Sequence, residues 1–355
     1  MRLLLAAGIT LALSGTAAAS GTFVELQTPN LQITRISPNG AYATGAADYM
    51  GVRWTAGTGT EEVLPALNGA MGINDSGTIG GTVPENGGAQ EGGRDHAAYA
   101  AIGQAPVQLT DKLSTNSSAY DISSDGTMVG LSFDDDFVGV AQAFMWTAKD
   151  GMIALPVNRP ANASRANAIS ADGSVIGGWN DQDFGDRTGV LWVAGEPMDI
   201  EDADGNPVGE VSAVSIDGRF AVGSNYVDSD FNMGSWRWSA QDGVTLIPGM
   251  TFAFAVSADG RTVVGSTGFF DIPPRAPMIW REGVGTVTLP EFLDEQGIAI
   301  PDGWGDLVGG LTAMSADGYT LGGWAFGDTA LQSYIIKLDA PDGIFQNGFE
   351  LPPVR

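Results

Sequence analysis

The sequence contains no cysteine, and His96 is its one histidine among 355 residues. Disulfides are therefore excluded, and stability must come from packing and from closure of the fold. Zinc sites are built largely from cysteine and histidine, so these counts argue against a zinc centre. The sequence also lacks a thiol nucleophile and a Gly-x-Ser-x-Gly motif of serine hydrolases. His96 falls in a loop-rich segment, where we expect an exposed surface residue rather than a general base.

Basic residues are scarce: 16 Lys and Arg stand against 42 Asp and Glu, which gives a formal net charge of −26. Nucleic acids and anionic membrane surfaces are bound by basic patches, so this charge argues against both as partners. The interpretation that we favour is that the acidic surface keeps the protein soluble. The alternative is that its field attracts cations or basic ligands.

Long hydrophobic runs are also missing, apart from Leu3–Leu13 near the N-terminus. This run is too short to span a membrane. It follows Arg2 and precedes Ala17–Ala19, an arrangement typical of a secretory signal peptide rather than of a buried N-terminal helix. We therefore expect a signal peptide over residues 1–19, and no membrane span after its removal. The expected mature protein is a single domain over 20–340 with a tail over 341–355, in the periplasm or outside the cell.

The sequence is instead rich in a repeat, seen most clearly in Ala166–Gly178. Seven copies share a Ser-x-Asp-Gly corner, or a worn form of it, between two short apolar runs. Asp-Gly in this setting favours a two-residue type I′ hairpin turn, in which both central residues have positive φ. The copies are about 45 residues apart. Their turn glycines are Gly40, Gly77, Gly126, Gly173, Gly218, Gly260 and Gly318.

Most copies contain four short apolar runs, and the third usually carries a tryptophan, as in Val190–Trp192. Four strands in a repeat of this length are typical of a propeller blade. We therefore predict an all-β fold, a seven-bladed β-propeller of four-stranded blades. The small residues of each first run suit innermost strands, and the tryptophans suit the spaces between blades. The unassigned run Thr22–Leu26 can complete the last blade beside Tyr334–Leu338 and so close the ring.

One insertion, over residues 290–310, interrupts the strand pattern. Leu289, Phe292 and Leu293 have helical spacing, and Gly297 lies where a C-cap glycine belongs. One short helix is therefore predicted before the last repeat.

The pattern Ala-x-x-[Ile/Val/Met]-Ser-x-Asp-Gly, followed by an Ala-Phe-x-Trp strand, resembles the HAF repeats of secreted bacterial proteins. The last copy is the most similar, with Leu289–Gly297, Trp304 and Ala313–Gly318 in order. The resemblance covers residues 33–338 and implies a secreted β-propeller-like domain. It implies no catalytic residue, because the pattern consists of turn and core positions. Copy two departs from it at Asn74–Gly77 and has no tryptophan, so blade two is the weakest part of the prediction.

A further motif, Asp-x-Asp-Phe, recurs between the second and third runs of copies three, four and five. In a propeller these connections emerge on one face, so three adjacent blades would present carboxylates and an aromatic ring there. Alternating aspartates can supply oxygen ligands to calcium, and an aromatic ring beside carboxylates suits a sugar or a cationic ligand. The alternative is that aspartate simply makes good turns, repeated by duplication. The candidate residues are Asp134, Asp136, Phe137, Asp181, Asp183, Phe184, Asp228, Asp230 and Phe231, the aspartates among them also as calcium ligands.

A propeller glycosidase also has to be considered, because two carboxylates about 5 to 10 Å apart can hydrolyse a glycosidic bond. The Ser-x-Asp-Gly corner is similar to the Asp-box of sialidases. It departs from that motif because Asp and Gly are adjacent and no tryptophan follows at the fixed offset. We therefore expect the turn aspartates to shape hairpins rather than to react. They are Asp125, Asp172, Asp217, Asp259 and Asp317.

The sequence thus predicts a secreted, non-catalytic binding or interaction module whose ligand is a glycan, a surface component or another protein. We expect a monomer, with calcium as the one cofactor that the acidic motif suggests. The first alternative is a carbohydrate-active enzyme that uses two of the rim carboxylates. The second is a structural surface protein with no small-molecule site.

Overall fold

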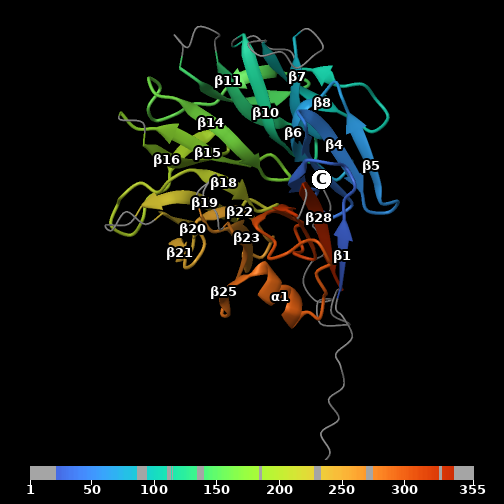
Figure 1. The fold of residues 1–355 in the computed structure, drawn as a ribbon. Coiled ribbons are helices and arrows are strands. Elements are labelled where there is room, and N and C mark those ends of the chain that lie inside the picture. The colour runs from blue at the N-terminus through green and yellow to red at the C-terminus, as the bar shows by residue number, and fades with distance from the viewer. Residues whose placement is uncertain are drawn as a thin grey trace, which may run out of the picture.

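The computed structural model describes most of the chain as one ring of β-sheets. The described residues are 21–85, 94–109, 113, 115–133, 140–183, 186–227, 233–268, 275–327 and 330–339. Within them the chain forms seven four-stranded antiparallel sheets, which follow one another around a common axis (Figure 1). The predicted seven-bladed propeller is confirmed.

The strands of blades one to six run outward from the axis in sequence order. The innermost strands of blades one to seven are β2 (Leu31–Ile36), β6 (Asn68–Ile73), β10 (Asn116–Ile122), β14 (Ser164–Ile169), β18 (Val211–Val214), β22 (Phe252–Val256) and β26 (Gly309–Met314). The second strands are β3 (Tyr42–Ala47), β7 (Ile79–Pro84), β11 (Met128–Phe133), β15 (Val175–Asp181), β19 (Phe220–Val227), β23 (Thr262–Ser266) and β27 (Thr320–Phe326). The third strands are β4 (Met50–Thr55), β8 (Asp95–Ala100), β12 (Gln142–Thr147), β16 (Arg187–Val193), β20 (Met233–Ser239), β24 (Pro277–Arg281) and β28 (Leu331–Leu338). The outermost strands are β5 (Thr60–Leu64), β9 (Val107–Gln108), β13 (Gly151–Ala154), β17 (Glu196–Asp199), β21 (Gly243–Ile247), β25 (Gly285–Thr288) and, in blade seven, β1 (Gly21–Glu25).

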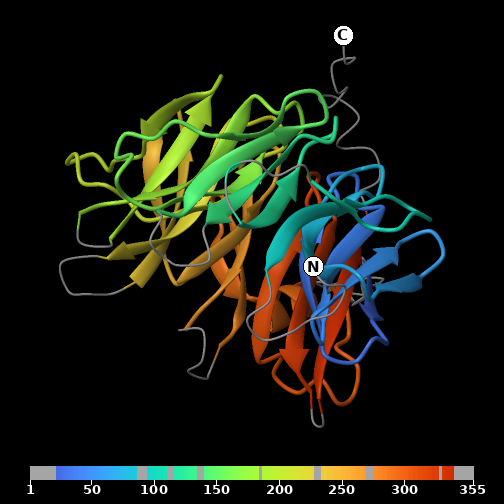
Figure 2. The same cartoon turned by 90° about the horizontal axis from the view of Figure 1, so that it is seen from above.

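Blade seven takes its outermost strand from the N-terminal part of the chain. β1 pairs antiparallel with β28 along its whole length, and Figure 1 and Figure 2 both show the blue N-terminal strands beside the red C-terminal ones. Phe23 of β1 stacks on Tyr334 and meets Trp304 edge-on, with ring centroids 5.3 and 5.2 Å apart. The predicted closure is therefore confirmed, and aromatic packing reinforces its backbone hydrogen bonds.

The Ser-x-Asp-Gly corners join the first and second strands. In blade four the Gly173 N–H donates to the Ser170 carbonyl, and the Ser170 N–H donates to the Val175 carbonyl. Asp172 Oδ1 accepts from the Ser170 hydroxyl and from the Ser174 N–H, at 2.7 and 3.0 Å. Of these residues only Gly173 has a positive φ. The predicted two-residue type I′ turn is wrong: the corner is a four-residue loop whose aspartate is held in an ordinary conformation by these hydrogen bonds.

The same bond from serine hydroxyl to aspartate occurs in the other well-kept copies of the corner. In blade three the hydrogen bond from Ser123, together with those from Thr127, lowers the pKa of Asp125. The turn carboxylates are thus occupied inside their own hairpins, as a structural role requires. The equivalent pairs are Ser123–Asp125, Ser215–Asp217, Ser257–Asp259 and Ser315–Asp317.

The corners of neighbouring blades are hydrogen-bonded to one another around the ring. In the clearest case the Ala171 N–H of blade four donates to the Ile216 carbonyl of blade five at 2.8 Å. All corners therefore lie on one side of the ring, which we call the turn face. The seven junctions, from blade one onward, are Asn39 to Asp75, Asn74 to Ser123, Ser124 to Ala171, Ala171 to Ile216, Arg219 to Ala258, Ala258 to Ala316 and Ala316 to Pro38.

Every innermost strand contains a β-bulge at the equivalent position. In blade four the bulge leaves Asn167 out of the ladder, and its side-chain amide donates to the Val211 carbonyl of blade five at 2.7 Å. The hydroxyls of Thr34 and Thr312 reach the following blade in the same way. A bulge redirects one side chain, and here it directs that side chain toward the neighbouring blade.

A glycine of the second strand lies against each bulge. A Cβ placed on Gly178 would lie 1.9 Å from the Arg165 carbonyl oxygen, far inside van der Waals contact. All seven blades need a residue without a side chain at this position. The equivalent glycines are Gly45, Gly81, Gly130, Gly223, Gly265 and Gly323.

The tryptophans of the third strands fill the spaces between blades, as predicted. Trp192 is fully buried and packs with Val129 of blade three, while its Nε1 donates to the Pro156 carbonyl at 2.6 Å. Trp54 and Trp236 are buried between their blades in the same manner. Blades one, four and five therefore each depend on a neighbour to bury a large aromatic side chain.

The predicted short helix is also present. α1 (Leu289–Glu295) begins at a capping box made by Thr288 and Glu291, and it buries its apolar face against blade six and blade seven. Gly297, with a φ of 68°, follows its C-cap. In the described part of the chain, no helix is long and apolar enough to cross a membrane.

Candidate functional site

The face opposite the turn face carries the connections between second and third strands, and we call it the loop face. The structure describes two residues of the Asp-x-Asp-Phe motif there, Asp181 at the end of β15 and Asp183 just after it. The predicted ligand-binding rim consists of the Asp-x-Asp-Phe motifs of blades three, four and five. In blades three and five it stays a prediction. The motif residues outside the described part of the chain are Asp134, Asp136, Phe137, Phe184, Asp228, Asp230 and Phe231.

In blade four both described aspartates contact the segment that leads into the blade. The Asn162 amide donates to the Asp181 carbonyl at 3.1 Å and to Asp183 Oδ1 at 3.3 Å. The Arg159 guanidinium also donates to the Asp181 carbonyl, at 3.1 Å. Two of the oxygens that a calcium ion would use are thus engaged by donors, and one of those donors is a cation.

The Asp181 carboxylate retains one buried oxygen, Oδ1, without a hydrogen-bond partner among the described residues. Burial raises the pKa of Asp181, while the Arg187 cation opposes this shift and the Glu210 carboxylate adds to it. Among the described residues, no three Asp, Glu or His side chains come together as metal ligands. Asp181 and Asp183 are therefore the only described carboxylates of the proposed rim that could contribute to a calcium site.

The calcium proposal makes a direct prediction for thermal stability. A ligand at 100 times its Kd stabilises the folded state by about 2.7 kcal/mol, which raises the melting temperature by about 4 °C for a chain of this size. This increase should disappear in the double variant Asp181→Ala with Asp183→Ala and persist in Asp204→Ala, an exposed turn aspartate used as the control. A melting curve of the wild-type protein that calcium leaves unchanged would remove the metal from the proposal.

His96 differs from the sequence expectation. It lies in β8 opposite Val83 of β7 rather than in a loop, and it is half-buried rather than exposed. Its Nδ1 is buried without a hydrogen-bond partner among the described residues. The ladder of blade two continues through this polar segment because backbone pairing, and not apolar content, extends the strand.

A cavity of about 90 Å³ lies on the axis at the turn face and is lined by residues of all seven blades. Its charged members are Arg35 and Asp121. The Arg35 guanidinium donates to the bulge carbonyls of Asn167, Ser212 and Phe254 at 3.3 to 3.4 Å, so one arginine of blade one bridges blades four to six. Burial raises the pKa of Asp121, and the Arg35 cation opposes this shift. These contacts hold the innermost strands together across the axis.

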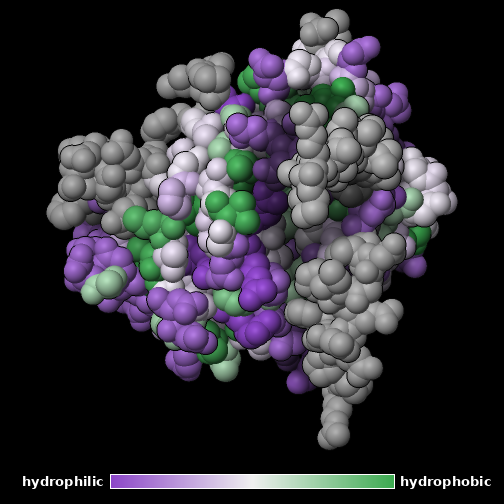
Figure 3. All heavy atoms as spheres, turned by 90° about the horizontal axis from the view of Figure 1, so that it is seen from below, coloured by the Kyte–Doolittle hydropathy of each residue, from purple (hydrophilic) through white to green (hydrophobic). Residues whose placement is uncertain are grey.

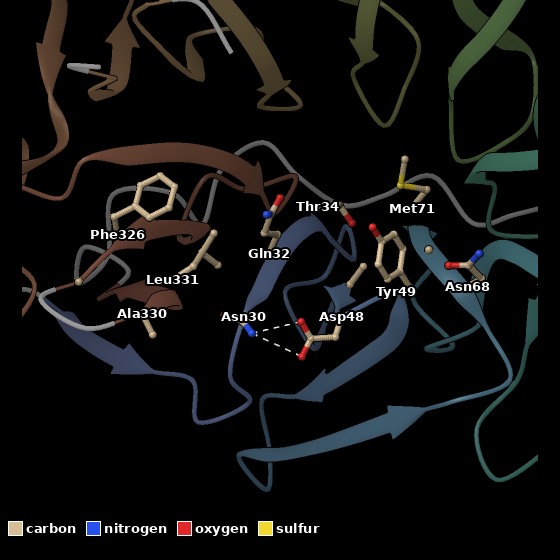
Figure 4. A pocket seen from close by; sticks show the side chains of 13 residues that line it. Asn30, Gln32, Thr34, Asp48, Tyr49, Asn68, Met71, Phe326, Ala330 and Leu331 are labelled. Atoms are coloured by element: carbon tan, nitrogen blue, oxygen red, sulfur yellow. Dashed lines mark hydrogen bonds between the residues drawn. The ribbon is translucent and has the colours of Figure 1, made fainter. Parts of the chain in front are cut away.

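A wide hollow of about 1030 Å³ lies on the loop face, where blades seven, one and two meet; we call it the loop-face hollow. Figure 4 shows Tyr49, from the β3–β4 turn, and Phe326, from the end of β27, on either side of Gln32. Tyr49 is 76% exposed and Phe326 is 59% exposed. Two large rings therefore face solvent in a depression of the surface instead of packing in the core.

The polar side chains of the loop-face hollow come from the same three blades. Asn30, Gln32 and Thr34 line it from blade one, and Asn68 lines it from blade two. Asp48 is the one charged residue among the described lining residues, and both oxygens of that carboxylate lie within hydrogen-bonding distance of the Asn30 amide, at 3.1 and 3.4 Å (Figure 4). The hollow thus combines neutral hydrogen-bonding groups with aromatic rings.

Backbone strain is concentrated at this hollow. Asn30, Asp48 and Tyr49 have φ values of 57°, 47° and 66°, a region that residues with a Cβ enter at an energetic cost. They make up three of the five non-glycine residues with positive φ in the described ranges. Asp48 and Tyr49 together form a two-residue turn of the type I′ kind, which is normally made by Asn-Gly or Gly-Gly. Strained residues of this kind cluster at functional sites.

A second polar cluster lies on the loop face in blades four and five. The guanidiniums of Arg165 and Arg187 both lie over Trp179, 5.4 and 4.4 Å from its ring centroid. Both arginines also form ion pairs with Glu210. The positive charges of the two arginines are balanced within the cluster by the carboxylates of Glu210 and Asp181. We therefore interpret the cluster as stabilising the junction between blades four and five.

Figure 3 shows one face of the molecule with hydrophilic residues gathered near the middle and hydrophobic residues in separate small patches. Broad protein-docking surfaces are marked by large continuous apolar patches. The described surface visible in this view has no such patch.

No protein-family model and no curated protein matches the sequence. The propeller domain of the Trilobed protease from Pyrococcus furiosus, described as having an open velcro topology, is 11% identical and covers 89% of this chain and 96% of its own, with a TM-score of 0.54. A chain of the Mitotic Checkpoint Complex is 13% identical over 93% of this chain and 98% of its own, with a TM-score of 0.54. TolB from Acinetobacter baumannii is 13% identical over 88% and 79%, with a TM-score of 0.46. The two structures with a TM-score of 0.54 support the propeller fold alone, so the resemblance to HAF repeats stays a prediction.

Proposed function

We propose that the protein is an exported, non-catalytic binding module and that the loop-face hollow is its ligand-binding surface. The observation that carries the proposal is the pair of solvent-facing rings, Tyr49 and Phe326, in a hollow of about 1030 Å³. Aromatic side chains with one solvent-exposed face are typical of binding surfaces, because a ligand that covers this face removes its unfavourable contact with water. The positive φ of Tyr49 supports the same conclusion, since a strained turn holds this ring outward.

The architecture suits such a role. Seven hydrogen-bonded junctions hold the turn face, and Arg35 bridges three blades across the axis. The opposite face is therefore presented by a rigid scaffold, which is how binding residues on connecting segments are usually positioned.

Export is proposed from the signal-peptide pattern of residues 1–19, which lie outside the described residues. The strongly acidic composition fits a soluble protein of the periplasm or the medium, and it disfavours nucleic acid as a partner. N-terminal sequencing of protein recovered from these compartments should find a chain that begins near Ser20. Recovery of chains that still begin at Met1, from the cytosol alone, would contradict export.

Removal of the two rings should abolish ligand binding while the fold persists. We expect Tyr49→Ala combined with Phe326→Ala to weaken binding at least tenfold, because interface aromatics usually contribute more than about 1.4 kcal/mol each. The measurement is a screen of a glycan array and a peptide library with the wild type and the double variant. Any ligand class that the double variant loses identifies the hollow as the site.

The matched control is Tyr319→Ala, which removes a partly buried tyrosine on the turn face. Ligands that bind the double variant as well as the wild type would place the site elsewhere and defeat the proposal. The alternative function, a carbohydrate-active enzyme, is tested by assaying hydrolysis of chromogenic glycosides. Release of product would show that the protein is a catalyst and not a non-catalytic binding module.

A further inference from the structure

Resting on the proposed function, we infer that the ligand of the loop-face hollow is a neutral oligosaccharide. Its sugar rings lie against Tyr49 and Phe326, and its hydroxyl groups bond to the side-chain amides of Gln32 and Asn68. Three properties of the hollow carry this inference: its free amides, its two separated aromatic platforms and the absence of Lys and Arg from its described lining residues.

The amides of the hollow are available to a ligand. Within the described part of the chain, the side chains of Gln32 and Asn68 have no hydrogen-bond partner, although both line the hollow. Each side-chain amide offers a carbonyl acceptor and two N–H donors on one plane. Neighbouring hydroxyl groups of a sugar also offer a donor and an acceptor side by side. The two sets of groups are therefore complementary without any charge.

The aromatic rings are placed on successive blades. Phe326 belongs to blade seven and Tyr49 to blade one, with Gln32 between them in Figure 4, and Met71 of blade two adds a third apolar group beyond Tyr49. The face of an aromatic ring is electron-rich and attracts weakly positive C–H groups, which line one face of many sugar rings. Two platforms separated by a polar segment suit a ligand that alternates apolar faces with hydroxyl-bearing edges, as an extended oligosaccharide does.

The electrostatics select against charged ligands. Among the described lining residues there is no Lys or Arg, and Asp48, the one charged residue of that set, is bonded to Asn30. The formal net charge of −26 further repels polyanions such as uronic-acid polymers and phosphorylated ligands. A cationic ligand could pair only with the Asp48 carboxylate among the described lining residues, and this carboxylate already accepts a hydrogen bond from Asn30.

A peptide ligand fits the hollow less well. Extended peptides commonly bind by adding a strand to a sheet edge. The strands that line the hollow offer no free outer edge, because β3, β27 and β28 are paired on both sides and β2 and β6 are innermost strands that face the axis. Amphipathic helices need a continuous apolar groove. Here Gln32 and Asn68 interrupt the apolar side chains.

The test is titration calorimetry of the mature protein with hexasaccharides of glucose, xylose and mannose, with hexagalacturonate and with an arginine-containing hexapeptide as comparison probes. We expect at least one neutral hexasaccharide to bind with the same Kd at 50 and 500 mM salt, because no ion pair is formed. Tyr49→Ala and Gln32→Ala should each weaken this binding about tenfold, Tyr49→Phe should retain it, and Tyr319→Ala should leave it unchanged.

The possible failures are distinguishable. The inference is overturned if no neutral hexasaccharide binds. It is also overturned if only the acidic sugar or the peptide binds and Tyr49→Ala abolishes that binding. In this second case the hollow is still a binding site, so the proposed function stands. If a neutral sugar binds but Tyr49→Ala with Phe326→Ala has no effect on its Kd, both the inference and the proposed site are wrong. Unchanged melting temperatures of the variants would show that each comparison is made on folded protein.

Discussion

Removal of residues 21–26 is expected to leave the propeller open and to lower its melting temperature by on the order of 10 °C or more. The deletion eliminates the whole ladder between β1 and β28 and uncovers the rings of Trp304 and Tyr334, which are buried beside Phe23. It also exposes β28 as an unpaired edge strand, which favours association between chains. Because folded proteins are stable by only about 5 to 15 kcal/mol, loss of one strand in the closing blade removes a large share of that stability. Thermal unfolding followed by circular dichroism, together with size-exclusion chromatography, measures both effects.

Two companion experiments separate closure from general damage. A synthetic peptide of residues 20–27, added in excess to the truncated protein, should restore the melting temperature, since it can occupy the vacant edge of blade seven. The same peptide with Phe23→Ala should restore less, because the full-length variant Phe23→Ala is itself expected to lose about 3 kcal/mol. Tyr49→Ala, which removes an exposed ring of similar size, is the control without a packing loss. A truncated chain that melts like the full chain would show that the ring does not depend on this strand.

Gly178→Ala is expected to destabilise the protein by about 3 kcal/mol and to lower its melting temperature by about 5 °C. The added Cβ would lie 1.9 Å from the Arg165 carbonyl oxygen, so either the bulge in β14 or the pairing of β15 has to move. That carbonyl belongs to the backbone, which cannot rotate away as a side chain can. The bulge also presents Asn167 to blade five, so the damage should extend to the neighbouring blade.

The matched control is Gly234→Ala. Gly234 also lies within a strand, β20, but a Cβ there meets nothing within 4 Å. This variant should change the melting temperature by little, because alanine suits a strand about as well as glycine or better. Equal destabilisation by both substitutions would mean that the contact at the bulge is not what requires glycine at position 178.

The repeat pattern was sufficient to predict the fold. Corners of the Ser-x-Asp-Gly kind, or worn forms of them, and short apolar runs recur in all seven blades, and five of the third strands carry a tryptophan. The same local structure is therefore indicated several times along the chain. Closure was predictable for a similar reason, because residues 22–26 formed a strand that lacked a partner while blade seven lacked a strand. The helix α1 was predictable from the spacing of three apolar residues and from the glycine that follows its C-cap.

The turn type and the bulges were not predictable from that pattern. Asp-Gly is the usual signal for a type I′ turn, but the buried serine hydroxyl and the aspartate carboxylate form a competing set of hydrogen bonds within a longer loop. The bulges depend on contacts between strands that lie more than forty residues apart, as between Asn167 and Val211. The repeated glycine of the second strand was the available signal, but a glycine in a strand does not by itself indicate which neighbouring group lies against it.

The loop-face hollow was missed for a different reason. Tyr49 and Phe326 belong to no repeated motif, and they lie 277 positions apart in the chain until closure brings blades seven and one together. A search for recurring residues gives no weight to such positions. The Asp-x-Asp-Phe motif, which does recur, falls mostly outside the described residues, so its role stays a prediction.

The pairing of β1 with β28 also sets the order of events during synthesis. The first strand of the ring to leave the ribosome waits for a partner that is made last, after every other blade. At about 5 to 20 residues per second this delay lasts roughly 15 to 60 s, during which the blades are synthesised one after another and no closed ring can form. Throughout that interval the nascent chain needs a chaperone, or must be kept unfolded, because the circle cannot be completed until the final blade has been translated.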